Sequence, residues 1–239
     1  MDFKQIPIPP LPSRLRNQGK RINDNHEALV AIQDLGESSI IDSPQYRKLG
    51  LSGALSRSLV RQGVGEKLVK AANLLPDEYS LVVWDGWRPY EVQKAIFDDY
   101  YSKLEHEHTG LTKDQLYEKT MKFVSPPSVD QGEPAPHITG GSVDLGILNE
   151  SGALLDFGTE FDDFTEKSRT RYYEEQLEQG HKLSPQEQNA LENRRLLYHV
   201  MGNSGFSNYF EEWWHFDYGN QWWAVSYQEP LAIYGLTNI

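Results

Sequence analysis

Residues 136–148 read PHITGGSVDLGIL, the stretch on which the predicted fold of this chain depends. Polar and apolar residues alternate from Gly141 to Leu148, which predicts a strand with one apolar face packed on a core. Asp144 lies on the opposite, polar face, and His137 precedes it by seven positions. An imidazole and a carboxylate held close together are candidate ligands for a metal ion.

A second stretch, EEWWHFDYG at residues 211–219, supplies a further histidine, His215. With His137 and Asp144 it offers two imidazoles and one carboxylate, a set that suits a catalytic zinc ion with one open coordination position. The chain contains no cysteine, so any metal site must use His, Asp and Glu side chains. The remaining histidines are expected to have surface or structural roles; they are His26, His106, His108, His181 and His199.

Hydrolysis at such a site also requires a general base. Zinc lowers the pKa of a water molecule to about 7, and a carboxylate must orient that water and carry its proton to the leaving amine. Glu211 and Glu212 are the candidates. On a regular strand Glu211 shares a face with His215, whereas a bulge or turn before His215 would select Glu212. The residues alone leave both alternatives open.

An arginine upstream lies at a predicted strand-to-helix corner. Residues 79–84, YSLVVW, indicate a buried strand, and the next two residues, Asp85 and Gly86, favour a turn. Pro89 is suited to the first position of a helix, which places Arg88 at the corner. A permanently charged group there could stabilise an oxyanion. The alternative is a structural salt bridge between Arg88 and Asp85.

Helical and strand patterns mix along the chain without an evident linker, which predicts an α+β protein and a single domain over residues 1–239. The proline-dense stretch Ile6–Pro12 favours an extended N-terminal arm over about residues 1–24. Helices are expected over 58–75, 89–101, 112–123, 164–179 and 184–200. Hairpins are expected where 141–148 pairs with 153–157 and where 207–218 pairs with 221–227.

The bulk composition excludes some classes of function. The chain has 23 basic and 35 acidic residues, a net charge of −12, which argues against binding nucleic acid or anionic membranes. No apolar run reaches the length of a membrane span, and the first residues lack the apolar segment of a signal peptide. We therefore expect a cytoplasmic protein. The sequence gives no indication of its oligomeric state.

Three motifs in order carry a resemblance to a known family. They are WDGWRP at 84–89, His137-x6-Asp144 with Gly140 between, and Glu212-x-Trp214-His215. Together they resemble the D-alanyl-D-alanine dipeptidases, zinc peptidases of the hedgehog and D,D-peptidase fold group. The resemblance extends from about residue 64 to residue 218. It implies an antiparallel central sheet flanked by helices.

The resemblance also implies roles for individual residues. It implies that His137, Asp144 and His215 bind one zinc ion per chain. It further implies that Glu212, not Glu211, is the general base, which requires an irregular strand before His215. Arg88 would stabilise the tetrahedral intermediate.

For substrate contacts the resemblance is weaker. The family has a Gly-Thr-x-Phe-Asp segment, which here is GTEFD at 158–162. It implies that Asp162, or the neighbouring Asp163, contacts the free amino group of the substrate; the alternative is a cap for a helix from Phe164 onward. Trp214 is expected in the wall of the substrate pocket. The chain departs from the family at Ala135, where serine is usual, and the stretch 166–200 resembles a helical insertion.

The predicted function is therefore zinc-dependent hydrolysis of a small dipeptide, with D-Ala-D-Ala as the expected substrate and cell-wall peptide metabolism as its setting. A D,D-carboxypeptidase acting on cell-wall peptides is the nearest alternative. A metal-binding module without activity is another. A sugar-binding protein would instead use the aromatic cluster of Trp213, Trp214, Trp222 and Trp223.

Overall fold

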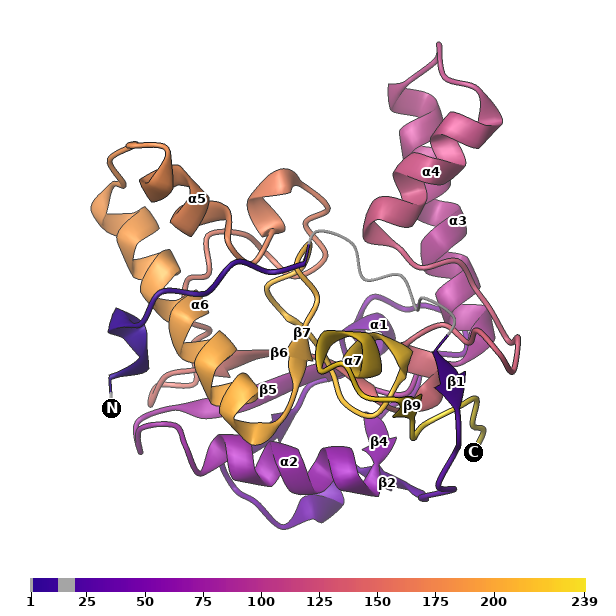
Figure 1. The fold of residues 1–239 in the computed structure, drawn as a ribbon, viewed down its shortest axis with the longest axis horizontal. Helices are drawn as coiled ribbons and strands as arrows, with labels where there is room; N and C mark the ends of the chain where they lie inside the picture. Colours follow the sequence, from indigo (N-terminus) through magenta and orange to yellow (C-terminus); the bar gives the residue numbers. More distant parts are fainter. Residues whose placement is uncertain (1, 13–19) are drawn as a thin grey trace.

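A five-stranded sheet forms the centre of the protein in a computed structural model that describes residues 2–12 and 20–239 (Figure 1). Its strands, in spatial order, are β3 (Ile40–Asp42), β5 (Ser80–Asp85), β6 (Ser142–Leu148), β8 (His215–Asp217) and β7 (Ser207–Asn208). The pairs from β5 to β7 are antiparallel, as expected, but β3 runs parallel to β5. The central sheet is therefore mixed, and the prediction of an antiparallel sheet is correct only in part.

The helices lie close to where the sequence predicts them. The longer ones are α2 (Gln62–Ala72), α3 (Tyr90–Glu107), α4 (Lys113–Phe123), α5 (Tyr172–Glu178) and α6 (Pro185–Ser204). Capping boxes at Thr112 and Ser184 begin α4 and α6, as their sequences indicate. The short helices are α1 (Gln45–Lys48), α7 (Gln221–Ser226) and the 3-10 turns η1 (Phe3–Gln5), η2 (Ile32–Leu35), η3 (His137–Thr139) and η4 (Glu166–Ser168). None of the described helices is both long and apolar enough to span a membrane.

Two small sheets lie beside the central one. In the first, β2 (Leu29–Ala31) pairs antiparallel with β4 (Leu59–Arg61). This pairing takes the first residues of the predicted helix 58–75, so α2 begins only at Gln62. In the second, β1 (Arg21–Ile22) pairs parallel with β9 (Leu231–Ala232).

Strand β6 is buried on both faces. Val143, Leu145 and Ile147 belong to the main hydrophobic core, as their alternation predicts. Ser142 and Asp144 on the opposite face are also buried. The polar face of β6 is therefore covered by protein and is not a solvated surface.

The stretch predicted to be an insertion contributes to the same core. Helix α6 supplies four buried apolar residues to it, namely Leu196, Leu197, Val200 and Met201. The N-terminal segment lies along α5 and α6 (Figure 1), where the Ile8 amide donates to Glu174 and the Ile6 carbonyl contacts His199. The predicted arm, 1–24, lies partly outside the described residues. The single domain and the insertion at 166–200 remain predictions.

The predicted C-terminal hairpin is wrong. Residues 221–226 form helix α7, because the Asn220 side chain accepts a hydrogen bond from the Trp223 amide and caps the helix. The predicted strand 207–218 is divided into β7, a loop and β8. The other predicted hairpin is reduced to one bridge, between Leu148 and Leu154.

Candidate active site

Two cross-strand pairs organise the site. In the register of β6 and β8, Asp144 lies opposite His215 and Ser142 lies opposite Asp217. Side chains of directly opposed residues project from the same face of a sheet. Asp144 Oδ1 is consequently 3.0 Å from His215 Nδ1.

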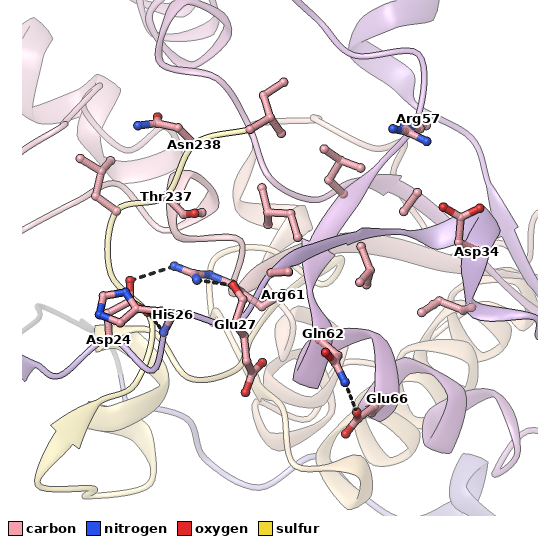
Figure 2. Close-up of a pocket in the computed structure, with 18 of the residues that line it drawn as sticks. Asp24, His26, Glu27, Asp34, Arg57, Arg61, Gln62, Glu66, Thr237 and Asn238 are labelled. Carbon is pink, nitrogen blue, oxygen red and sulfur yellow. Dashed lines mark hydrogen bonds and ion pairs between the residues drawn. The ribbon is translucent and has the colours of Figure 1, made fainter.

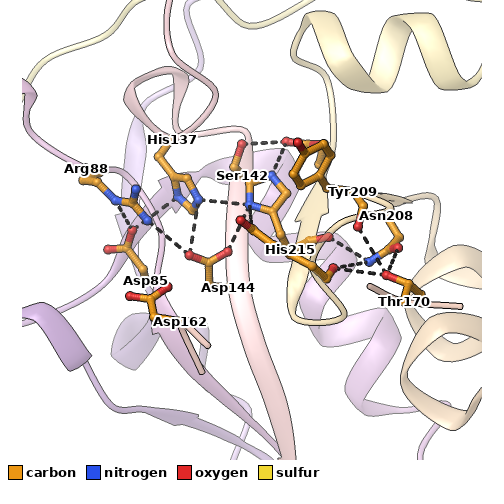
Figure 3. A network of polar contacts seen from close by, with 12 residues as sticks. Asp85, Arg88, His137, Ser142, Asp144, Asp162, Thr170, Asn208, Tyr209 and His215 are labelled. Atoms are coloured by element: carbon orange, nitrogen blue, oxygen red, sulfur yellow. Dashed lines mark hydrogen bonds and ion pairs between the residues drawn. The ribbon is translucent and has the colours of Figure 1, made fainter. Parts of the chain in front are cut away.

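His137 reaches the same place from η3, just before β6. Gly140 ends this turn with a φ of +72°, and a Cβ atom there would lie 2.7 Å from a Leu29 methyl group. The turn aims His137 Nε2 at Asp144 Oδ2, 3.3 Å away, and at His215 Nδ1, 3.2 Å away. Figure 3 shows the three side chains turned toward one another, with Arg88 and Asp85 on one flank.

This donor set fits a zinc ion. Tetrahedral ligands at roughly 2.0–2.1 Å from zinc lie roughly 3.3 Å from each other. The imidazole nitrogens are 3.2 Å apart, Asp144 Oδ1 is 3.0 Å from His215 and Asp144 Oδ2 is 3.3 Å from His137, all close to that value. His137, Asp144 and His215 are the group of this kind found among the described residues.

Hydrogen bonds on the far side of each imidazole leave the correct nitrogen free. His137 Nδ1 lies 2.8 Å from the Gly86 carbonyl oxygen, to which it can only donate. His215 Nε2 lies 3.1 Å from Asp217 Oδ1. Both lone pairs therefore point into the cluster, as metal-binding imidazoles require.

Arg88 combines the two roles that the sequence leaves open. Its Nε donates to Asp85 Oδ2 at 2.7 Å, which is the expected structural salt bridge. Its Nη1 donates to Gln93 at 2.7 Å, and its Nη2 lies 3.2 Å from Asp144 Oδ2. Arg88 also lines the cleft beside the cluster, so its guanidinium is anchored and still faces the site.

The loop between β7 and β8 distinguishes the two glutamates. The Glu212 amide donates to the Tyr209 carbonyl, so the chain turns before His215 instead of continuing as a strand. Glu212 lines the cleft, with its Oε2 3.8 Å from His215 Nδ1. Glu211 does not line it. Simple alternation is therefore the wrong description of this segment. Burial raises the pKa of Glu212 well above its ordinary value.

The first residues of the 166–200 stretch support this loop. Thr170 Oγ1 lies 3.2 Å from the Glu212 carbonyl oxygen, and the Trp213 amide donates to the Ser168 carbonyl. Asn208 on β7 donates to the same Glu212 oxygen at 3.1 Å. The position of Glu212 thus depends on backbone contacts from two separate segments.

Of the substrate residues implied by the resemblance, some line the cleft and one does not. Asp162 lines the cleft and accepts a hydrogen bond from Tyr46 at 2.9 Å, and burial raises its pKa to about 7. Asp163 does not line the cleft. Trp214 lines the cleft, and the centroids of its ring and the Phe161 ring are 5.6 Å apart.

Some cleft residues are missed by sequence reasoning. Tyr46, Gln93 and Tyr209 line the cleft. Gln93 could have been found, because a glutamine among the apolar residues on the buried side of α3 requires a polar partner. Tyr46 gives no such signal, since it comes from a short helix about forty residues upstream of Arg88.

A larger cavity of about 900 Å³ lies elsewhere, between α2, β2, β4 and the C-terminal residues (Figure 2). Arg61 in its wall pairs with Asp24 at 3.0 Å and donates to the Thr139 carbonyl at 2.9 Å. Arg61 therefore connects the wall of this cavity to η3. The group of candidate metal ligands is in the smaller cleft.

Comparison with known proteins agrees with this chemistry. Residues 50–232 match the family of D-Ala-D-Ala dipeptidases, peptidase family M15. The chain belongs to this family. The protein is accordingly a hydrolase of the metallopeptidase class, which argues against a binding module without activity.

Curated relatives cover most of the chain. It is 27% identical over 231 residues to a D-alanyl-D-alanine dipeptidase of Synechocystis sp., a match that covers 90% of this chain and 93% of the relative. It is 29% identical over 164 residues to an Enterococcus faecium protein of the same name, covering 64% and 69%. An Escherichia coli protein of that name is 27% identical over 138 residues, covering 57% and 54%.

Proposed function

We propose that this protein is a zinc-dependent dipeptidase that hydrolyses D-alanyl-D-alanine, a building unit of cell-wall peptides. The observation that carries the proposal is the convergence of His137, Asp144 and His215 with Glu212 and Arg88 around one cleft. These five residues supply the functions that peptide hydrolysis at a metal requires. One ion per chain would be held by the two imidazoles and the aspartate.

Glu212 acts as the general base in this proposal. A zinc ion bound at the site would lower the pKa of a water molecule and polarise the scissile carbonyl. Glu212 takes the proton from the attacking water and passes it to the leaving amine. Its raised pKa makes the carboxylate a stronger base for the first step.

Arg88 stabilises the negative charge that develops on the carbonyl oxygen. Its Nη2 faces the cluster beside Asp144, and its other donors are held by Asp85 and Gln93. A guanidinium fixed before the substrate binds needs little reorganisation in the transition state. Arg88 remains charged throughout.

Asp162 makes the site selective for a free dipeptide. Its buried carboxylate would pair with the ammonium group of the substrate, whereas an acylated amine would offer that carboxylate no charge partner. Apolar side chains such as Ile96, Phe164 and Trp214 line the cleft and suit small methyl groups. This arrangement favours a dipeptidase over a D,D-carboxypeptidase, whose substrates are acylated.

A panel of four substrates tests the proposal. Purified protein should contain about one zinc ion per chain and hydrolyse D-Ala-D-Ala. L-Ala-L-Ala, N-acetyl-D-Ala-D-Ala and a cell-wall pentapeptide should be poor substrates. Chelation should abolish activity, and zinc should restore it. Efficient cleavage of the acetylated compound or the pentapeptide would instead assign the protein as a carboxypeptidase.

A further inference from the structure

Asp217 is a buried carboxylate that the proposed reaction does not use. It follows His215 by two positions on β8, so the two side chains project from the same face of the sheet. Its exposed fraction is 0%. Ser142 lies directly opposite on β6. The Ser142–Asp217 pair is therefore the neighbouring pair along β6 and β8, on the same face of the sheet as the Asp144–His215 pair.

One oxygen of Asp217 collects three polar contacts. Asp217 Oδ1 lies 3.1 Å from His215 Nε2, 2.7 Å from Ser142 Oγ and 2.6 Å from Asn220 Nδ2. A charged oxygen with this many donors is firmly fixed in position. Asp217 Oδ2, by contrast, has no hydrogen-bond partner within the described part of the chain.

The direction of each hydrogen bond follows from the surrounding contacts. Asn220 Oδ1 accepts from the Trp223 amide, so its Nδ2 must face Asp217 and Ser142. Ser142 Oγ accepts from this Nδ2 at 3.0 Å, which directs its own hydrogen to Asp217. Asp217 accepts in every case, and His215 must carry its proton on Nε2.

The charge of Asp217 is also directed at His215. Its charge-pair partner among the described residues is His215, with no lysine or arginine in contact. A buried carboxylate with one unpaired oxygen is costly unless a cation lies nearby. A metal ion on the other nitrogen of His215 would provide that cation, and the carboxylate would make the imidazole a stronger ligand.

We propose that Asp217, held by Ser142 and Asn220, is a positioning residue that fixes the tautomer and orientation of His215 and so strengthens metal binding. The inference rests on the proposed metal site. It adds a residue to that site that contacts neither the metal nor the substrate.

Metal affinity tests the inference without an activity assay. Apoprotein is titrated with Zn²⁺ and Co²⁺ in competition with a chromophoric chelator, and the Co²⁺ absorption spectrum is recorded. Asp217→Ala should weaken both metals by about 10- to 100-fold, the range for loss of such a partner. Asp217→Asn, which keeps an acceptor but loses the charge, should show a smaller loss. Both variants should alter the Co²⁺ spectrum.

Ser207→Ala is the matched control. Its hydroxyl donates to the main-chain oxygen of Asp217 at 3.4 Å, so this variant removes a neighbouring buried hydrogen bond without changing the carboxylate. Its metal affinity should equal that of the wild type. Unchanged affinity in Asp217→Ala would overturn the inference; if that variant does not fold, unchanged affinity in Asp217→Asn overturns it. If the wild type itself binds neither metal, the proposed metal site fails first.

Discussion

The two halves of the cleft are built in different ways. One half, with the proposed metal ligands, rests mainly on paired strands, where the register of β6 and β8 sets Asp144 against His215, while His137 lies on η3 just before β6. The other half, to which we assign catalysis and substrate recognition, rests on loops, which carry Glu212 and Asp162. Strand pairing fixes the separation of ligand atoms to a fraction of an ångström, which a metal requires. Loops can change with little effect on the sheet, so they are suited to setting what is cleaved.

Each half has its own support. The strand half is backed by the Ser142, Asp217 and Asn220 contacts behind His215. The Glu212 loop is held mainly through its backbone by Thr170 and Asn208. The comparison therefore predicts that substitutions in the strand half alter metal binding. Substitutions in the loop half should alter catalysis or selectivity while the metal stays bound.

Loss of a strand-held ligand should have the largest effect. His215→Ala should lose both zinc and activity, because two ligands form an incomplete site. Metal content by atomic absorption, measured beside hydrolysis of D-Ala-D-Ala, checks this result. His199→Ala is the control, since this histidine contacts the Ile6 carbonyl away from the cleft. Full zinc content in His215→Ala would show that the strand-held histidine is not a metal ligand and would contradict the comparison.

Glu212→Gln should separate the two halves most clearly. We expect zinc to be retained and kcat to fall by about 10²- to 10⁴-fold, the usual contribution of a general base. Glu211→Gln is the matched control and should keep a rate close to the wild type, because Glu211 lies outside the cleft lining. A reversal, with Glu211→Gln inactive, would mean that the loop before His215 has another conformation.

Arg88→Lys should have the next largest effect. The substitution keeps the positive charge but loses the planar fork that contacts Asp85, Gln93 and Asp144 together. We expect kcat to fall by about 10²- to 10³-fold, as when a donor to an oxyanion is lost, with zinc still bound. A change confined to KM would contradict this role and indicate that Arg88 serves ground-state binding.

Asp162→Asn should have the smallest effect and the most specific one. Loss of a charge-assisted hydrogen bond of about 1.5 kcal/mol corresponds to roughly a tenfold rise in KM for D-Ala-D-Ala. Discrimination against N-acetyl-D-Ala-D-Ala should decrease in parallel. Asp163→Asn, outside the cleft lining, should leave both measurements unchanged. An equal response of the free and acetylated compounds would remove Asp162 from amine recognition.

The contrast also explains what the sequence could predict. Alternation identifies β6 and the face of Asp144, because a strand has a fixed period. Capping boxes locate the starts of α4 and α6, since these motifs are local. Residues 221–227 mislead, because aromatic residues favour strands and the Asn220 cap overrides that preference. The choice between Glu211 and Glu212 depends on a turn that no period encodes.

Residues brought together only by tertiary contacts are the hardest to predict. Tyr46 contacts Arg88 and Asp162 across long sequence separations, and no local pattern anticipates this. Asp217 is an intermediate case. The spacing His-x-Asp on a strand already indicates a carboxylate on the face of His215, but its bond to Nε2 is visible only in the fold.

The separation of the proposed metal ligands along the chain has a consequence for folding. His137 and His215 are 78 positions apart, and Asp144 and His215 are 71 apart. Contacts at such separations carry a high loop-closure entropy and form slowly. High-affinity metal uptake should therefore begin only when β8 has docked on β6, which makes it a kinetic probe of this pairing. During refolding, Co²⁺ absorbance should lag behind the appearance of helical signal.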